Sequence, residues 1–441
     1  MAIKTVINRF LNYYDEGLIE FPQNRMLYAD QFTDEGPFTD EDREGFKPRN
    51  IKDVFEYYQP HKEGIALKTE DGEVVYENFY FKSIKDFEDN QLIAQSEILR
   101  KQESKAIEQL RNNLRLIHEQ IRGIEIAYRT LYAFFANTGI GEVDCLTLMN
   151  VNKDELKSHD SKDIVAICKE IDKYYDRLNL KDNYSLLVVP SYLGDSNTIR
   201  MWADMAYRNK VILLTDFKDS FSFEILKEEL YNANLQGKDV HLSNVVMTCN
   251  YLLGRKKSKL ANEDDDVYIP GSAALAGRMA NTDEIVITHG VAGMKYGRLS
   301  NVKGVRLNLR KAEIATLIDL GVIPMIETDG RTMAFSDRTL YNGCTACLQK
   351  YPIVRVLDWM TKVIQCFINR SSYVNWDERH RSEILENINN FLCDYMGPDK
   401  LFQHYKLIRF ELDKITKDII FQVELDFSSH ERYLLELVCY E

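Results

Sequence analysis

Two polar residues follow apolar segments in a way that is typical of catalytic sites in α/β proteins. Asp216 comes directly after the apolar residues 211–215, and His289 comes directly after residues 284–288. The carboxyl ends of strands are where α/β enzymes place acids, bases and nucleophiles. An α/β enzyme of unknown reaction that uses Asp216 and His289 is therefore one hypothesis. Because polar residues at strand ends are usually ordinary turn residues, we favour that simpler interpretation for both positions.

A glycine-rich stretch at residues 290–297, which reads GVAGMKYG, has the composition of a phosphate-binding loop but not its spacing. No Gly-Lys-Ser/Thr closes it, and the dinucleotide fingerprint is missing after Val189, where PSYLG stands. We also find no nucleophile elbow, zinc-protease pair or calcium loop. The sequence therefore supports no specific reaction, and we expect no catalytic residue and no cofactor.

The eight cysteines are scattered, and only Cys344 and Cys347 have the spacing of a metal or redox pair. A zinc site would need a second pair or nearby histidines, and none is evident in the sequence. We therefore expect no metal site and reduced thiols, as in a cytosolic protein.

Length and composition describe a folded, acidic protein. The 441 residues suit two or three domains, and 45% of them are hydrophobic. The net charge of −13 disfavours nucleic acid, which needs a clustered basic face. The chain shows no signal-peptide pattern and no apolar run near the roughly 20 residues of a membrane span. We expect a cytoplasmic protein without a membrane partner.

The first half of the chain reads as an irregular arm followed by a long helix. Residues 1–88 form the arm, with a strand near 74–81, and residues 89–135 form the helix with a break near Gly123. Apolar residues recur at helical spacing: Ile93, Ile98, Leu99, Ile107, Leu110, Leu114 and Ile117. Either a coiled coil or an amphipathic helix on a domain core fits this pattern, and we favour the second.

The central region, 89–370, predicts an α/β core, and 371–441 predicts a C-terminal helix followed by β-strands. The strand segments are largely continuous apolar runs, as in parallel sheets covered on both faces. The expected strands are 144–150, 184–189, 211–215, 245–253, 284–288 and 322–327. The expected helices are 161–178, 196–209, 271–281, 310–320, 351–370 and 376–396.

The last forty or so residues alternate between apolar and polar, which is typical of half-buried strands. The apolar members of the last two strands are Phe421, Val423, Leu425, Phe427, Tyr433, Leu435 and Leu437. Such strands either complete the chain's own sheet or pair with a neighbouring subunit. From the residues alone we favour an intramolecular meander.

Several segments, in order along the chain, resemble the large subunit of the type VI secretion contractile sheath, the TssC/VipB family. Residues 123–132 (GIEIAYRTLY) resemble that family's LEASWRGLHYL, and 146–156 (LTLMNVNKDEL) resemble RVLNVSKKEL. Residues 246–255 (VMTCNYLLGR) are similar to LTLPRFLLRLPYG. Residues 268–281 (YIPGSAALAGRMAN) and 312–324 (AEIATLIDLGVIP) are similar to LWGNAAYAFAARLA and EKELSDLGFIPL. Residues 81–87 (FKSIKDF) resemble a motif of the small sheath subunit instead.

The resemblance implies a structural, non-enzymatic protein with a mixed α/β fold. Its family assembles with a small sheath subunit (TssB/VipA-like) and with copies of itself in hexameric rings. It surrounds an inner tube protein (Hcp-like), contracts to propel that tube from a baseplate, and is dismantled by a ClpV-like ATPase. The rival hypotheses are the α/β enzyme and a self-contained scaffold protein.

The resemblance also implies where contacts lie. The C-terminal strands would then pair with neighbouring subunits rather than form a closed meander. A C-terminal helix would meet the tube, and the acids Asp377, Glu378, Glu383 and Glu386 are our candidates for that contact. A solvated helix face explains the same acids equally well.

Overall fold

The computed structural model divides the chain into two compact units, Met1–Ile121 with Lys257–Asp265, and Arg122–Lys256 with Asp266–Glu441. The predicted domain boundaries at 88 and 370 stay predictions. The structure describes residues 66–68, 74–77, 89–138, 143, 146–152, 154–158, 161–175, 180, 183–259, 261–281, 290–371, 378–398, 400–412, 419–428 and 431–439. The predicted strand 284–288 lies outside these residues.

The first unit contains a short hairpin, the start of a long helix and a loop. The hairpin pairs β1 (Ala66–Lys68) with β2 (Val74–Glu77) in antiparallel register. Glu263, whose side chain is 6% exposed, holds the loop 257–265. Its carboxylate contacts His118 Nδ1 (3.0 Å) and accepts from the Ser258 amide (2.7 Å). The long helix therefore has a polar anchor to this loop.

The long helix is α4, Asp89–Asn137, and it runs through Gly123 without a break. The predicted break is therefore wrong. A glycine in a helix interior costs only about 1 kcal/mol relative to alanine. Glu125 and Arg129 form an i,i+4 ion pair (2.9 Å) just beyond it, which supports the helix there.

A five-stranded sheet forms the middle of the second unit, in the order β3-β4-β5-β8-β9. The first four strands are parallel and β9 pairs antiparallel with β8. Their bounds are β3 Leu186–Val189, β4 Ile212–Asp216, β5 Val245–Cys249, β8 Ile323–Thr328 and β9 Arg331–Ala334. Every residue of β4 and β5 is buried, which confirms the parallel, doubly covered strands.

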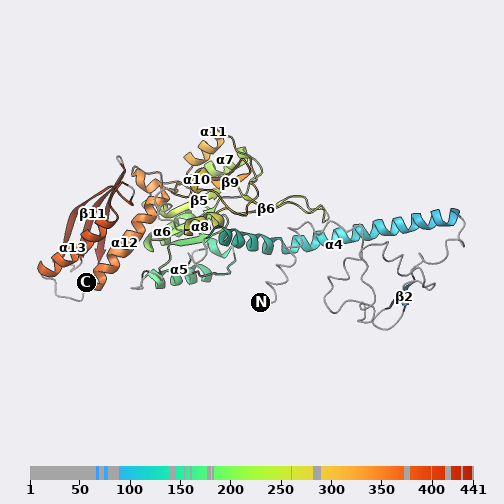
Figure 1. Ribbon diagram of the computed structural model, residues 1–441, viewed down its shortest axis with the longest axis horizontal. Coiled ribbons are helices and arrows are strands. Elements are labelled where there is room, and N and C mark those ends of the chain that lie inside the picture. The colour runs from blue at the N-terminus through green and yellow to red at the C-terminus, as the bar shows by residue number, and fades with distance from the viewer. Residues whose placement is uncertain are drawn as a thin grey trace. The chain divides into compact units, whose positions relative to one another are not determined.

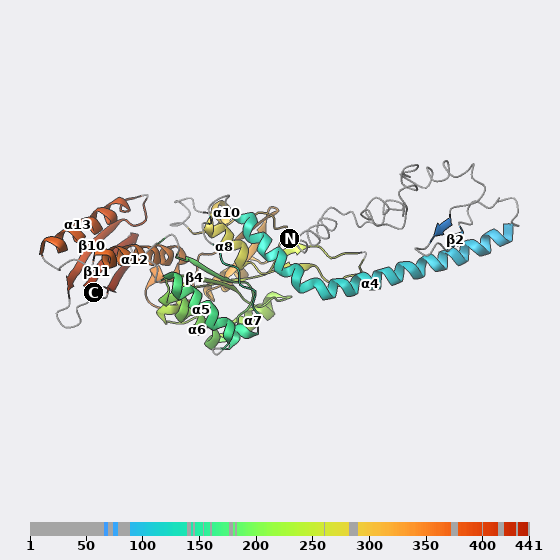
Figure 2. The same ribbon diagram turned by 90° about the horizontal axis from the view of Figure 1, so that it is seen from below.

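Helices cover both faces of this sheet, with α5, α6 and α7 on one side and α8 on the other (Figure 2). Their bounds are α5 Lys162–Tyr175, α6 Ser196–Arg208, α7 Phe223–Ala233, α8 Ser272–Ala280 and α11 Lys311–Asp319. Helix α7 was not expected from the sequence. It begins where the Ser222 hydroxyl accepts from the Ile225 amide (3.3 Å). Residues 146–150 form no strand, contrary to expectation.

The predicted strand 245–253 is split in two, and Asn250 is the reason. Its backbone is left-handed (φ 69°), which ends β5. Its side-chain amide donates to the carbonyls of Leu307 (2.9 Å) and Met325 (2.7 Å), and its oxygen accepts from the Leu307 amide. The chain then turns into a hairpin of β6 (Leu252–Arg255) and β7 (Val267–Ile269).

Helix α8 lies against the end of α4 at a point where only glycine fits. A side-chain carbon on Gly277 would lie 2.2 Å from the Phe134 carbonyl oxygen. The two backbones can approach this closely because Gly277 has no Cβ. The end of α4 is therefore part of the second unit's core.

The C-terminal part packs a three-stranded antiparallel sheet against two helices (Figure 1). The helices are α12 Tyr351–Ser371 and α13 Glu378–Asp394, and the strands are β10 His404–Leu412, β11 Ile419–Ser428 and β12 Glu431–Cys439. Both helices and all three strands were expected from the sequence. No described helix is both long and apolar enough to cross a membrane.

Candidate assembly surface

Asp216 lies fully buried at the end of β4, where the sequence placed it. Its carboxylate accepts from the amides of Ser191 (3.0 Å) and Ser272 (2.9 Å). It also accepts from the hydroxyls of Thr248 (2.5 Å) and Ser272 (2.5 Å). Burial raises the pKa of Asp216, against these hydrogen bonds, which lower it.

This arrangement fits a structural role for Asp216. A carboxylate has about four acceptor positions, and donors from the protein occupy them here. The crevice beyond strand ends, where α/β proteins receive ligands, is therefore filled at this point by the chain's own carboxylate. His289, the proposed second catalytic group, lies outside the described residues.

The glycine-rich stretch 290–297 forms a packed turn. Gly290 and Gly293 have positive φ (71° and 70°), and the helix α10 (Gly293–Tyr296) lasts a single turn. A side-chain carbon on Gly297 would lie 2.4 Å from the Ala334 carbonyl oxygen. The glycines therefore serve the local backbone path.

The cysteine pair forms no metal centre in the described residues. Cys344 is exposed and Cys347 is buried, and both are free thiols. The Cys347 thiol lies 3.7 Å from the Arg432 carbonyl in β12. Within the described ranges no three His, Cys, Asp or Glu side chains gather closely enough to hold a metal ion.

The predicted inter-subunit residues line the inner face of the C-terminal sheet. Phe421, Val423, Leu425, Leu435 and Leu437 are buried in the unit's own core, while Phe427 and Tyr433 are half-buried. The strand β11 pairs with β10 on one side and β12 on the other. Any pairing with a neighbouring subunit must therefore use an outer strand, because β11 has no free edge.

The two outer strands differ from β11 in this respect. Among the described residues, β10 and β12 each pair with a strand on one side only. The guanidinium of Arg381 in α13 donates to the Phe410 carbonyl of β10 (3.1 Å). Ile408, the extra residue of a β-bulge in β10, and Leu434 and Val438 of β12 are exposed apolar residues on this sheet. These strands are the candidate sites for added β-pairing.

The acidic tube-contact candidates lie on α13, apart from Asp377, which lies outside the described residues. Glu378, Glu383 and Glu386 are exposed. Glu378 contacts Arg381 (3.4 Å) and Glu383 contacts Arg379 (3.1 Å), both within the helix. The surface therefore carries less net negative charge than its glutamates alone indicate.

Helix α4 carries an apolar seam with the alternating three- and four-residue spacing of a coiled coil. The α4 seam consists of Ile107, Leu110, Leu114, Ile117, Ile121, Ile124, Tyr128, Leu131 and Phe135. Ile117 is 44% exposed, Ile124 58% and Phe135 51%, and no seam residue is fully buried. A seam of this length on a single helix is the pattern that a partner helix covers.

The seam corrects the expectation that the apolar face of this helix packs on its own domain core. The second unit instead covers a different side of α4, whose buried residues are Glu125, Arg129, Thr130, Ala133, Phe134 and Asn137. The sequence prediction did not include the residues from Ile124 onward, because Gly123 favours a break in the helix. The unbroken spacing from 107 to 135 was the available signal.

A buried ion cluster fixes the covered side of α4. Glu125 accepts from Arg255 of β6 through both oxygens (2.6 and 2.9 Å) and from Arg129 Nε (2.9 Å). Burial alone would raise the pKa of Glu125, but the two arginines outweigh it and lower that pKa. The cluster therefore sets which side of the helix stays outward.

A second buried cluster joins α12 to the central sheet region. Asp358 accepts from Asn244 Nδ2 (2.6 Å), and Lys362, one turn later, donates to the Tyr184 carbonyl (2.7 Å). Burial raises the pKa of Asp358 to about 6, although Lys210 and Lys362 act to lower it. Burial likewise lowers the pKa of Lys362 to about 8.

Comparison with protein families gives two matches. The model of the type VI secretion system TssC/VipB central domain matches residues 116–342, which is more than half of the chain. The TssC/VipB-like C-terminal domain matches residues 350–433. No curated protein gives a significant match.

Three chains from solved structures are similar to part of this chain. A chain of the anti-feeding prophage helical sheath in its contracted state is 17% identical over 69% of this chain and 79% of that one, with a TM-score of 0.49. A chain of the anti-feeding prophage baseplate is 15% identical, over 69% and 77%, with a TM-score of 0.48. The sheath tail protein from Desulfitobacterium hafniense is 14% identical, over 64% of this chain and only 60% of its own, with a TM-score of 0.43.

Proposed function

Because the chain belongs to the TssC/VipB family of the type VI secretion system, we propose that it is the large structural subunit of a contractile sheath. The family match over residues 116–342 is the observation that carries this function. In this role the chain works in the cytoplasm, joins copies of itself in hexameric rings around an inner tube protein, and contracts from a baseplate. A ClpV-like ATPase then dismantles the contracted sheath.

The exposed α4 seam supports a helical partner for this subunit, and we assign that partner helix to the small sheath subunit. Ile117 and Ile124 occupy the second apolar position of successive heptads, where isoleucine favours bundles of more than two helices. The positions that flank the seam on its open side, Asn113, Gln120 and Ala127, are uncharged. A partner helix with an apolar stripe can therefore approach closely without a matching charge pattern.

The seam is tested by co-expression with the small sheath subunit. Ile117→Asp with Ile124→Asp places two charges in the seam, and we expect at least a tenfold loss of co-purified partner. Leu116→Asp is the matched control, because Leu116 is 50% exposed on the same helix but outside the seam. Retention of the partner by the double variant, with the helix intact by circular dichroism, would reject this assignment.

The C-terminal sheet supports a second link, between sheath subunits. A strand from a neighbouring subunit can extend the sheet at β10 or β12 through main-chain hydrogen bonds, each worth on the order of 1 kcal/mol. The residues Phe421 to Leu437 listed for this role then act indirectly. They hold β10 and β12 in place from the inner face of the sheet.

The acids of α13 support a contact with a basic inner tube. Attraction of this kind screens with salt. Glu383→Lys with Glu386→Lys is expected to lower the amount of tube protein recovered with the sheath, most clearly at low salt. Glu108→Lys, an exposed change of the same sign on α4, serves as the control. Equal tube recovery from the α13 variant and the control would remove these acids from the contact.

A further inference from the structure

Helix α7 presents an acidic face with large apolar side chains. Phe221 and Tyr231 are each 75% exposed and Ile225 is 51% exposed. Glu224 and Glu228 lie between them on the same side of the helix and are also exposed. The Arg306 guanidinium stacks over the Phe221 ring at 4.6 Å, which holds that ring in its exposed position. We call these five residues the α7 face.

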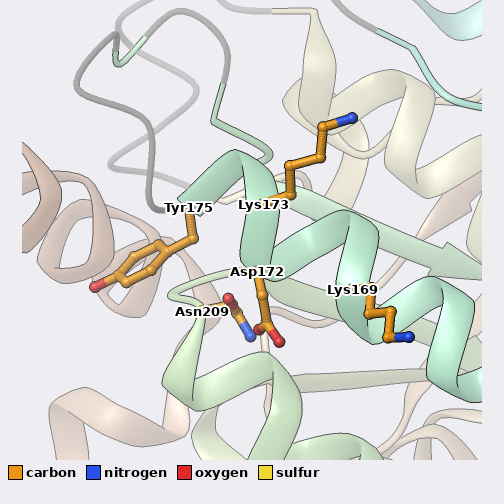
Figure 3. Close-up of a pocket in the computed structure, with 5 residues that line it drawn as sticks. All are labelled: Lys169, Asp172, Lys173, Tyr175 and Asn209. Atoms are coloured by element: carbon orange, nitrogen blue, oxygen red, sulfur yellow. The ribbon is translucent and has the colours of Figure 1, made fainter.

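Helix α5 presents a basic face beside an open pocket. Lys162, Lys169 and Lys173 lie along one exposed side of this helix, with the exposed Val165 among them. The pocket has a volume of about 470 Å³ and is lined by Lys169, Asp172, Lys173, Tyr175 and Asn209. Figure 3 shows Asp172 of α5 beside Asn209, which follows α6, with Lys169 and Tyr175 to either side. We call the three lysines, Val165 and this pocket the α5 face.

The two faces cannot meet within one chain. Helix α5 precedes β3, an edge strand of the central sheet, and α7 connects β4 to β5, the second and third strands of that sheet. Figure 1 places α7 on the upper side of this unit and α5 on its lower side, while Figure 2 places both in the same helix layer. Faces on opposite sides of one subunit are available for contact between neighbouring subunits.

The chemistry of the two faces is complementary. Glu224 and Glu228 of the α7 face outnumber Lys227, an exposed lysine beside them on α7. The α5 face carries three lysines against Asp172 and against Glu170, which lies 3.7 Å from Lys173. On α7, Tyr231 lies about two turns beyond Glu224, and on α5 the pocket begins about two turns beyond Lys162. With Glu228 opposite Lys169, parallel packing places Tyr231 at Asp172 in the pocket and Glu224 at Val165, about one turn beyond Lys162. Lysines around a phenol ring add a cation–π attraction.

We propose that the α7 face of one copy of this chain docks on the α5 face of the next copy, with the Tyr231 ring in the pocket beside Asp172 and Asn209. This inference rests on the proposed sheath function and names the surface by which its copies meet side by side. The contact is head-to-tail, because the two faces differ, and such contacts generate rings when their rotation closes and helical filaments when it does not. A ring or helix of copies is the arrangement that a sheath needs.

A charge-swap cycle in the full-length chain, co-expressed with the small sheath subunit, tests the contact. Glu224→Lys with Glu228→Lys, and separately Lys169→Glu with Lys173→Glu, are each expected to reduce the pelletable tubes by at least about tenfold. The two pairs combined restore opposite charges across the contact and are expected to recover assembly to within about threefold of wild type. Tyr231→Ala alone is expected to weaken assembly without a change in net charge.

The controls separate this contact from the sheath function itself. Glu108→Lys with Glu119→Lys adds the same charge as the α7 double variant at exposed positions outside both faces and is expected to assemble normally. Wild-type chain that forms no tubes would overturn the sheath function and this contact with it. Two results would overturn the contact alone. One is a wild-type amount of pelletable tubes from each charge-swapped pair, and the other is a combined variant that assembles no better than either pair by itself.

Discussion

Asp216 and Ser272, which lie far apart in the chain, are joined by two hydrogen bonds, one from the serine amide (2.9 Å) and one from its hydroxyl (2.5 Å). Ser272 is the first residue of α8, so the carboxylate lies at the positive end of that helix. Helix N-termini often bind phosphate or other anions from a ligand. Here the anion is a side chain from the end of β4.

Asp216→Ala is expected to destabilise the chain by about 3 kcal/mol or more, because it leaves several buried donors without an acceptor. Asp216→Asn keeps one acceptor oxygen and is expected to cost less. Urea unfolding followed by circular dichroism measures both. Asp172→Asn, at an exposed aspartate, serves as the control. A loss below about 1 kcal/mol for Asp216→Ala would contradict the structural role.

The Glu125 cluster predicts a loss of stability in acid. The folded-state pKa of Glu125 is lowered, so its contribution is present above its ordinary value of 4.5 and is lost as pH falls through the folded pKa. At pH 7, Glu125→Gln leaves two buried arginines without their carboxylate and is expected to cost roughly 3–5 kcal/mol.

The difference in stability between wild type and Glu125→Gln should therefore shrink as pH falls below 4.5. Thermal unfolding of both proteins from pH 3 to pH 7 measures it. Glu119→Gln removes an exposed carboxylate from the same helix and serves as the control, because it should cost little stability. A constant difference for Glu125→Gln across this range would show that its charge is not what the cluster requires.

The buried Asp358 predicts the opposite dependence of stability on pH. Its pKa is raised to about 6, so its contribution is fully present below its ordinary value of 3.8 and is lost as pH rises through about 6. Asp358→Asn removes this titration, and its stability relative to wild type should rise by roughly 3 kcal/mol between pH 4 and pH 7. Melting temperatures of the two proteins across that range test the sign. A fall in the variant's relative stability with rising pH would mean that the lysines, rather than burial, dominate at Asp358.

Proline substitutions in β12 test the proposed pairing with a neighbouring subunit. Neighbouring residues in an edge strand point their amides alternately toward the partner strand and away from it. Proline is tolerated only where the amide points away. Of Tyr433→Pro and Leu434→Pro, we expect one to unfold the sheet and the other to keep its melting temperature but lose assembly.

Deletion of residues 405–441 is a poorer test of the same pairing. It removes Phe410, Phe421 and Val423 from the hydrophobic core, so failure to assemble would follow from unfolding alone. A folded proline variant that forms normal tubes would exclude β12 from the link, and the same scan in β10 would then decide the matter.

The sequence predicted the α/β elements well wherever an apolar run decided the structure. The segments 211–215 and 322–327 became β4 and β8, each within about one residue of expectation. One error came from a side chain acting at a distance. Asn250 splits a continuous apolar run because its amide bonds to Leu307 and Met325, which the local sequence does not reveal.

The residues of the candidate assembly surface could be predicted only in part from the sequence. Alternation correctly identified the strands that carry Phe421 and Leu435, but it does not indicate which strand lies in the centre of a sheet. The α4 seam was visible in the spacing of its residues, and Gly123 concealed its second half. Whether the seam is covered depends on which side of α4 packs on the second unit. The ion pair of Glu125 in α4 with Arg255 in β6 sets that side, and only the structure shows this pair.

The central position of β11 has a consequence for the order of events in the life of the protein. Since β11 has both neighbours within its own chain, the pairing of that strand needs no other subunit. In the proposed sheath, each copy can then enter and leave the assembly as a folded subunit. Joining and separation would make or break only contacts at the sheet's rim, with no need to refold the subunit.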